Sequence, residues 1–285
     1  MSTARPATPA SPDDPRVLAF ARLVGVVDRL RAPDGCPWDL KQTVATMAPN
    51  LVEEAHEAVE AIETARDDEL PIELGDLLMV VTLIARIAQD EGRFDLATAG
   101  HAVSDKLIRR HPHVFGEVDA RTADQVLANW EAIKKAERTE KQEDASALAG
   151  IPRNLPALQR AARLCGKAVS AGFKWDDVSG AVAKLAEEER ELLDALRAAG
   201  LDRDARSPAT PDQRAAVEHE LGDVLLASAF LAQYLGLDPE RLCRDAARRF
   251  EARFRHMESE LERPLSEMGL PELHDLWERA KERTA

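Results

Sequence analysis

The sequence predicts an all-α protein that contains two tandem copies of one helical bundle module. Aromatic residues make up 4% of the chain, whereas Ala, Leu, Glu and Arg are abundant. These abundant side chains lose little freedom in a helix, and the β-branched and aromatic types that favour strands are few. Leu51, Ala55, Val59 and Ile62 recur at helical spacing, and no alternating strand pattern stands out. Each module should therefore hold four or five helices.

Five short motifs occur twice along the chain in the same order, which indicates an internal duplication. The chain has four tryptophans, and all four fall at matched positions of these motifs. The pairs are 35–39 with 172–176 (GxxWD), 53–57 with 187–191 (EExxE), 73–76 with 220–223 (ELGD), Lys106 and Arg110 with Arg249 and Arg253, and 130–134 with 277–281 (WExxK).

The duplication predicts two modules that are joined by a linker. The first residues are polar and Pro-rich, which predicts a flexible tail. Pro152 and Pro156, ahead of the second copy, would stop a helix. The second copy also holds extra residues, including 200–213, whose Pro, Asp and Ser predict a loop. The expected division is a tail at 1–15, a first module at 16–137, a linker at 138–156 and a second module at 157–285.

The composition narrows the range of partners and compartments. Lys and Arg total 38 against 52 Asp and Glu, a formal net charge of −14, and an acidic surface repels nucleic acids. A polyphosphate substrate would need a divalent cation between itself and the carboxylates. The three cysteines are far apart and form no CxxC pair, which predicts a reducing cytoplasm. The longest apolar stretch, 77–88, is too short to span a membrane and predicts a buried helix.

The acidic motifs predict a metal site. Glu53, Glu54 and Glu57 occupy one arc of a helix, and Glu73 and Asp76 share an apolar face of the next helix. A carboxylate along an apolar face is costly unless it is paired or binds a cation. Two such helices can converge on one site, and ligands that are all oxygen suit Mg²⁺ or Mn²⁺. The second module repeats the set as Glu187, Glu188, Glu191, Glu220 and Asp223.

Each of these signals also has an ordinary structural explanation. A single EExxE motif is usually a solvated helix face, but two copies with the same flanking residues favour a metal site. The basic pairs could hold phosphate oxygens or form exposed ion pairs. A tryptophan could stack on a base, although core packing is its commoner role. The nucleotide-binding candidates are Lys106, Arg110, Trp130, Lys134, Trp175, Arg249, Arg253, Trp277 and Lys281.

The order GCPWD, EExxE, ELGDLL, SDKLIRRHPHVF and WExxK resembles the tandem-domain MazG family of nucleoside triphosphate pyrophosphohydrolases. The resemblance covers nearly the whole chain from about residue 18, and its most specific stretches are 35–39, 109–115 and 151–158. It implies an all-α homodimer with Mg²⁺ held by the EExxE and ExxD carboxylates, where Mn²⁺ could substitute. It also implies hydrolysis of nucleoside and deoxynucleoside triphosphates to the monophosphate and pyrophosphate, a house-cleaning role in the nucleotide pool.

The resemblance assigns roles by position. The implied metal ligands of the second module are Glu188, Glu191, Glu220 and Asp223, with Glu187 adjacent. The implied substrate contacts are Lys184, Arg249, Arg253, Trp277 and Lys281. The family often has Lys where Arg249 stands, and Arg keeps the charge with a different geometry. It often has Asn near Ala247, so one polar contact is missing here.

The first module differs from the second at one predicted site position. Asn50 stands where the second module has Lys184, so the first site has one cation fewer. Its carboxylate set is complete, and we expect metal binding in both modules and stronger catalysis in the second. The candidate catalytic residues are Glu187, Glu188 and Glu191, and Glu187 is our choice for the base that takes a proton from water.

Three other functions compete with this interpretation. A ferritin-type di-iron oxidase would need two ExxH motifs, and only residues 53–56 form one. An HD-type phosphohydrolase would need more histidines than His274 beside Asp275. A non-catalytic helical nucleotide-binding or regulatory scaffold protein remains the alternative, and it predicts surface carboxylates that bind no Mg²⁺.

Overall fold

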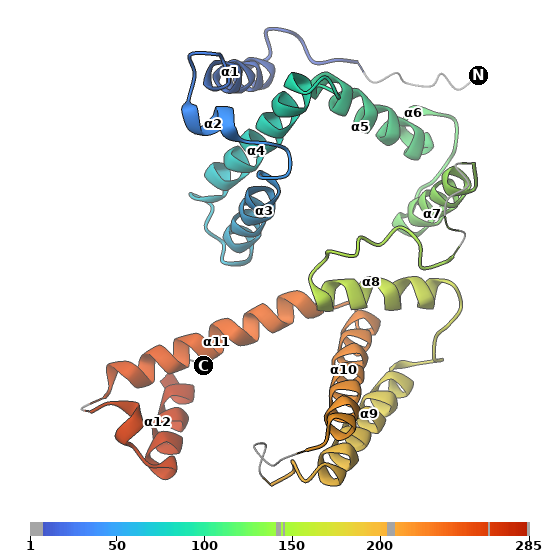
Figure 1. Cartoon of the computed structure of the whole chain (residues 1–285). Helices are drawn as coiled ribbons and strands as arrows, with labels where there is room; N and C mark the ends of the chain where they lie inside the picture. The colour runs from blue at the N-terminus through green and yellow to red at the C-terminus, as the bar shows by residue number, and fades with distance from the viewer. Residues whose placement is uncertain (1–7, 141–143, 145, 204–208, 262, 284–285) are drawn as a thin grey trace. The chain divides into compact units, whose positions relative to one another are not determined.

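The computed structural model describes residues 8–140, 144, 146–203, 209–261 and 263–283 (Figure 1). Within these ranges the chain forms helices joined by turns and loops, without a strand. The prediction of an all-α fold is confirmed. The chain divides into two compact units, Met1–Lys141 (unit 1) and Gln142–Ala285 (unit 2). The division falls inside the stretch 138–156 that was expected to link the modules.

The described part of unit 1 holds five long helices and two short ones. They are α1 (Pro15–Leu30), α2 (Pro37–Lys41), α3 (Ala48–Glu63), α4 (Leu70–Asp90), α5 (Leu96–Arg110), α6 (Pro112–Phe115) and α7 (Ala123–Glu140). The Asp14 carboxylate accepts a hydrogen bond from the Arg16 amide at 2.8 Å before α1, and Asp95 accepts one from the Thr98 amide at 2.7 Å before α5. Such caps satisfy amides that have no partner inside the helix, so they fix where α1 and α5 begin.

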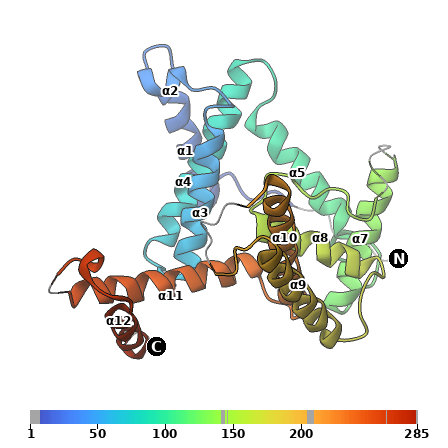
Figure 2. The same cartoon turned by 60° about the horizontal axis from the view of Figure 1, so that its bottom comes forward.

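Helices α3 and α4 lie side by side in unit 1, and α1 packs against α4 (Figures 1 and 2). The stretch 77–88, predicted to be a buried helix, is the central part of α4 and supplies most of the core. The buried cluster consists of Val27, Met47, Val80, Leu83 and Ile87. The core therefore fixes the position of α4, which carries Glu73 and Asp76 near its beginning.

The buried face of α3 differs from the apolar pattern of its sequence. Ala58 and Ala61 are buried, whereas Val59 is exposed and Ile62 is 60% exposed. Small alanines let α3 approach α4 closely, and the larger apolar side chains point elsewhere. Val59 and Ile62, which share the helical spacing of Leu51 and Ala55, are therefore not buried within unit 1 by itself.

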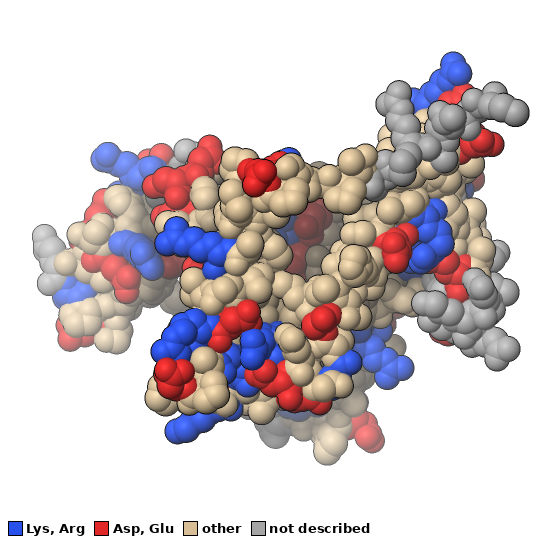
Figure 3. All heavy atoms as spheres, turned by 90° about the horizontal axis from the view of Figure 1, so that it is seen from above, with Lys and Arg blue, Asp and Glu red and all other residues tan. Residues whose placement is uncertain are grey.

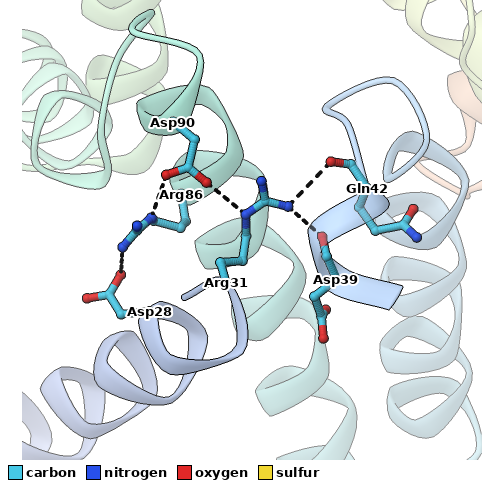
Figure 4. A network of polar contacts seen from close by, with 6 residues as sticks. All are labelled: Asp28, Arg31, Asp39, Gln42, Arg86 and Asp90. Carbon is cyan, nitrogen blue, oxygen red and sulfur yellow. Dashed lines mark hydrogen bonds and ion pairs between the residues drawn. The ribbon is translucent and has the colours of Figure 1, made fainter. Parts of the chain in front are cut away.

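Arg31, at the end of α1, holds the loop that carries the GCPWD motif. Its guanidinium donates to the carbonyl oxygens of Asp39 at 2.5 Å and Gln42 at 3.4 Å, and its Nε lies 2.9 Å from the Asp90 carboxylate (Figure 4). Arg86 donates to the other oxygen of Asp90 at 3.0 Å. Burial raises the pKa of Asp90, but the hydrogen bonds from Arg31 and Arg86 outweigh it and hold the pKa below its usual value.

The described part of unit 2 holds five helices and one short 3₁₀ turn at Leu265–Glu267. The helices are α8 (Ala157–Ser170), α9 (Val178–Ala198), α10 (Pro211–Tyr234), α11 (Pro239–Ser259) and α12 (Leu270–Arg283). The predicted loop lies mostly between α9 and α10, although residues 204–208 of it fall outside the described residues. Thr210 and Gln213 exchange hydrogen bonds between side chain and backbone, a capping box that begins α10.

Unit 2 contains two packed groups of helices. Helices α9 and α10 lie side by side, and α8 packs against α10. Met257 of α11 and Leu276 and Ala280 of α12 form a separate buried cluster. Figures 1 and 2 show α12 standing apart from the α9–α10 pair of the same unit.

The surface is charged, with both signs present. On the face seen in Figure 3, Lys and Arg side chains lie in small groups beside Asp and Glu. Among the described helices none is by itself long and apolar enough to cross a membrane. Only α10 and α11 together meet those requirements, and they are bent by 108° at the break between them.

Candidate metal and nucleotide site

The EExxE motif of unit 1 lies on α3, and the ExxD motif lies on α4. Because the two helices pack side by side, carboxylate oxygens of Glu54, Glu57 and Glu73 lie within 4.8 Å of one another. Glu54 and Glu73 are half-buried and Glu57 is exposed. The structure therefore brings together three of the five acidic residues predicted for this site.

The first cluster is electrostatically unfavourable without a cation. Partial burial, followed by repulsion from Asp76 and Glu57, raises the pKa of the Glu54 carboxyl. Partial burial, followed by repulsion from Glu57 and Asp76, likewise raises the pKa of the Glu73 carboxyl. These influences place Asp76 in the surroundings of the cluster, although it is outside the group of three. Like charges that disfavour one another in this way would be relieved by a bound cation.

Unit 2 repeats the arrangement on α9 and α10. Carboxylate oxygens of Glu188, Glu191 and Glu220 lie within 4.8 Å of one another, and these residues correspond one by one to Glu54, Glu57 and Glu73 in the sequence. Glu188 is the most buried of them, with 7% of its surface exposed. The duplication seen in the sequence thus extends to the geometry of the acidic groups.

A lysine distinguishes the second cluster. Lys184 Nζ lies 2.7 Å from Glu188 Oε1 and 3.4 Å from Glu187 Oε2, both within one turn of α9. The hydrogen bond to Glu188, with a further contribution from Glu187, raises the pKa of Lys184. The ammonium therefore faces the carboxylates of Glu187 and Glu188, and its contact with phosphate stays a prediction.

The remaining predicted acids of the two units are outside the two groups of three. Glu53 of α3 is exposed, and Glu187 of α9 contacts Lys184 as described above. Asp223 Oδ2 lies 3.4 Å from Nε2 of His219, one turn earlier on α10. Sequence analysis did not single out His219, although its spacing of four residues from Asp223 could have suggested the contact.

The clusters suit a hard divalent cation. Each consists of carboxylates alone, contributed by two helices, with no Cys or His among the three residues. Mg²⁺ and Mn²⁺ prefer such oxygen ligands, and Mg²⁺ usually takes only a few from protein and shares the rest with water and phosphate. Three converging carboxylates per unit therefore fit Mg²⁺ with room for a phosphate ligand.

Four basic and aromatic candidates of unit 2 lie on α11 and α12. The Arg253 guanidinium lies 5.9 Å from the centre of the Trp277 ring, and the Phe250 ring lies 5.4 Å from it. Lys281 is paired with Glu278 at 2.6 Å, and Arg249 is exposed. Trp277 also packs against the buried cluster of α11 and α12. Arg253 and Trp277 thus form one surface, on helices other than those that carry the carboxylates.

The corresponding residues of unit 1 lie on α5 and α7. The Arg110 guanidinium lies 5.7 Å from the centre of the Trp130 ring, as Arg253 does from Trp277. Arg110 also pairs with Glu137 at 2.6 Å, which the sequence did not suggest. Lys134 pairs with Glu131 at 2.8 Å, and Lys106 is exposed on α5.

The two GxxWD tryptophans have different surroundings. Trp38 is exposed, whereas the Trp175 ring packs edge-on against Phe230 at 4.9 Å. The Trp175 carbonyl accepts a hydrogen bond from the Tyr234 hydroxyl at 2.6 Å, and Gly180 leaves room for the ring, because a Cβ there would lie 2.3 Å from it. The structure places Trp175 in packing, the commoner of the two roles considered for it.

Comparison with known proteins identifies the domain type of both modules. A family model described as the MazG nucleotide pyrophosphohydrolase domain matches residues 42–115 and again 178–258. The two matches contain both carboxylate clusters and both basic pairs. They end before the two WExxK motifs.

Named relatives match over almost the whole chain. The "Nucleoside triphosphate pyrophosphohydrolase" of Escherichia coli K12 is 41% identical over 264 residues, which cover 91% of this chain and 96% of that protein. The "Nucleoside triphosphate pyrophosphohydrolase/pyrophosphatase MazG" of Thermotoga maritima is 37% identical over 267 residues, which cover 93% of this chain and 96% of that protein. A crystal structure of a mazG-related protein from Thermotoga maritima matches 40% of this chain and 98% of its own, with 30% identity and a TM-score of 0.37.

Proposed function

Since the chain belongs to the MazG nucleotide pyrophosphohydrolase family, we propose that it hydrolyses nucleoside and deoxynucleoside triphosphates with the help of Mg²⁺. Water attacks the α-phosphorus, the bond from that phosphorus to the bridging oxygen breaks, and pyrophosphate leaves the monophosphate behind. Such a reaction clears unwanted triphosphates from the nucleotide pool, a role that would place the protein in the cytoplasm.

One observation carries the metal part of this proposal: the same three carboxylates converge in both units. A single acidic helix face is common on protein surfaces, but two helices in each of two units bring equivalent glutamates within 4.8 Å. Mg²⁺ bound there would polarise a phosphate oxygen and lower the pKa of a bound water. The proposed ligands are Glu188, Glu191, Glu220 and Asp223 in unit 2, and Glu53, Glu54, Glu57, Glu73 and Asp76 in unit 1, and Mn²⁺ could substitute.

The other residues of unit 2 have distinct proposed roles. Glu187 lies outside the converging group and next to Lys184, so it can take a proton from the attacking water while its neighbours hold the metal. Lys184 would turn from Glu188 to a phosphate oxygen once a divalent cation neutralises the carboxylates. Arg249, Arg253 and Lys281 would bind the triphosphate, and Trp277 would contact the nucleoside.

The second module is the proposed centre of catalysis. Lys184 adds a cation to its acidic cluster, and the first module has Asn50 at that position. A triphosphate carries several negative charges, so it approaches an acidic cluster more readily when a lysine is present. The first module would still bind metal through its complete carboxylate set.

We also propose that the chain forms a homodimer through the apolar sides of α3–α4 and α9–α10. Each pair exposes large apolar side chains in its own unit, more than isolated surface residues would provide. They are Val52, Ile62, Ile72, Leu74, Leu78 and Val81 in unit 1, and Val182, Leu193, Leu221, Leu225 and Leu226 in unit 2. In addition, α12 stands apart from α9 and α10 of its own unit, so a second copy could supply Trp277 and Lys281 to the carboxylates that α9 and α10 carry.

Sedimentation velocity of the full chain tests the dimer. We expect twice the mass of the chain, and a lower mass when Leu78 and Leu225 are both replaced by Glu. The exposed Leu18→Glu on α1 is the matched control and should leave the mass unchanged. A monomeric wild-type protein would contradict the dimer, and the apolar sides would then be covered within one chain.

The reaction itself is tested by incubating the full chain with a panel of nucleoside and deoxynucleoside triphosphates and Mg²⁺. We expect monophosphate and pyrophosphate in equal amounts. Diphosphate and orthophosphate would contradict attack at the α-phosphorus. A protein that binds neither Mg²⁺ nor any triphosphate in calorimetry would instead support the scaffold alternative.

A further inference from the structure

The Glu137 carboxylate on α7 lies between two arginines at the end of α5. Arg109 Nε donates to its Oε1 at 2.7 Å, and Arg110 donates to its Oε2 through Nε at 3.1 Å and Nη2 at 2.6 Å. Both oxygens of the carboxylate are thus engaged by guanidinium groups. Proteins also bind phosphate in this way, with guanidinium groups that donate to two anionic oxygens.

The same arginine faces the WExxK tryptophan. Arg110 lies over the Trp130 ring at 5.7 Å, and the His111 ring contacts the edge of that tryptophan at 5.0 Å. Arg110 and Trp130 are the counterparts of Arg253 and Trp277, to which the preceding section assigns the triphosphate and the nucleoside. In unit 1 this surface therefore already holds an anion, and the anion belongs to the chain.

We propose that Glu137 occupies the phosphate position of the first module, so that this module binds a triphosphate only when the Glu137 carboxylate is displaced. The inference rests on the proposed function, because it takes the Arg–Trp surface to be the place of the triphosphate. It adds a self-contained reason, independent of Asn50, for the two modules to differ in nucleotide binding.

The surroundings of Glu137 keep its carboxylate bound to the two arginines. Only 16% of its side chain and 21% of that of Arg110 are exposed, so water screens the pair less than an open surface ion pair. Hydrogen bonds from Arg110 and Arg109 lower the pKa of Glu137 to about 2. The carboxylate is therefore charged throughout the neutral range, and mild acid does not release the arginines.

The second module lacks this carboxylate in its sequence. Glu137 stands seven residues after Trp130, and the residue seven after Trp277 is Thr284, which is uncharged. The duplication has thus kept the arginine and the tryptophan in both copies but not the acid. The acid at this position therefore distinguishes the first copy from the second.

Calorimetric titration of the full chain tests the inference. The ligand is the α,β-methylene analogue of a triphosphate that the wild-type protein hydrolyses, with Mg²⁺ present. We expect one binding site per chain for the wild type and two for Glu137→Gln. The first module of Glu137→Gln should bind the analogue at least ten times more tightly than the first module of the wild type. Adding Arg110→Met to Glu137→Gln should abolish the new site.

Asp119→Asn is the matched control, because Asp119 pairs with Arg121 in the same unit without contacting Arg109 or Arg110. It should leave one site per chain. Circular dichroism checks that the variants keep their helices. Should Glu137→Gln lose helix content, Glu137→Asp replaces it: this variant keeps the charge but shortens the reach, and a weaker second site is expected.

The outcomes separate the inference from the function on which it rests. Two sites in the wild type, or one site in a folded Glu137→Gln or Glu137→Asp variant, would overturn the role of Glu137 and leave the proposed function intact. Absence of triphosphate hydrolysis and of binding in every variant would overturn both.

Discussion

Lys184 and Asn50 give two otherwise equivalent acidic clusters different charges. The Lys184 ammonium lies 2.7 Å from Glu188, so the second cluster keeps an internal counter-ion when no metal is bound. Asn50, one turn before Glu54, is uncharged. A single residue thus distinguishes the two clusters: the second contains a lysine paired with one of its carboxylates, and the first has no charge at the equivalent position.

Replacing one central carboxylate in each cluster separates the roles of the two modules. We expect Glu191→Gln to lower kcat/KM for triphosphate hydrolysis by about a hundredfold or more, because it removes a metal ligand from the proposed centre of catalysis. Glu57→Gln should lower kcat/KM far less. Steady-state release of pyrophosphate measures both, and loss of activity in Glu57→Gln alone would reverse the assignment.

At the residue scale the sequence predicts contacts along a helix better than contacts between helices. Glu188 and Glu191 share a face because three residues make nearly one helical turn, so their convergence could be expected from spacing. The pairing of Arg110 with Glu137 spans 27 residues, and it depends on how α5 and α7 pack. Local periodicity carries no information about that packing.

At the scale of elements, Arg31 joins three parts of unit 1. Its side chain is 8% exposed, and it connects the end of α1 to α4 and to the GCPWD loop. Gly35 adds to the tightness of that loop, because a Cβ there would lie 2.2 Å from the carbonyl oxygen of Leu30. The spacing between the loop and α4 is therefore maintained by buried polar contacts.

Removing the Arg31 guanidinium should destabilise unit 1. Arg31→Met removes one donor from Asp90, which keeps its hydrogen bond from Arg86, and one donor from each of two carbonyl oxygens. We expect this loss to lower the free energy of unfolding by about 2–4 kcal/mol. Arg29→Met on the same helix is the control, because Arg29 and its partner Asp34 are both exposed and such a pair contributes at most about 1 kcal/mol. Urea unfolding measures both variants, and equal effects would contradict the role of Arg31.

The ion pair between Arg110 of α5 and Glu137 of α7 makes the stability of unit 1 depend on pH in a defined direction. Since the pKa of Glu137 falls from 4.5 to about 2 in the folded state, its contribution to stability is present above pH 4.5 and is lost as the pH falls towards 2. We expect Glu137→Gln to be less stable than the wild type by about 1–2 kcal/mol at pH 7. Thermal unfolding from pH 7 to 2.5 should show this difference shrinking below pH 4.5, and a constant difference would refute it.

Element positions follow from the sequence more reliably than the faces that the elements bury. Capping residues such as Thr210 and Asp95 mark helix beginnings, because their side chains accept hydrogen bonds from the unpaired amides of the first turn. The buried side of α3 could not be deduced in this way. Val59 and Ile62 continue the apolar spacing, yet alanines face α4, since close approach of two helices selects for small side chains.

For the molecule as a whole, the two units present the same acidic geometry twice. Divalent cations that bind only the folded state stabilise it by mass action, by about 2.7 kcal/mol at a hundredfold excess over Kd. We therefore expect saturating Mg²⁺ to raise the melting temperature by several degrees, and K⁺ at equal ionic strength to have a smaller effect. In the Glu57→Gln, Glu191→Gln double variant the Mg²⁺ effect should disappear, and its persistence would locate the metal elsewhere.

The unequal surroundings of Trp38 and Trp175 have an optical consequence. An indole in contact with water emits at a longer wavelength than one enclosed by other rings, so Trp38, which is 55% exposed, and Trp175, which packs against Phe230, contribute different parts of the fluorescence spectrum. Trp38 therefore reports on unit 1 and Trp175 on unit 2, each from different surroundings. Unfolding of unit 2 would shift the Trp175 emission to the red, whereas the Trp38 emission of unit 1 would move little.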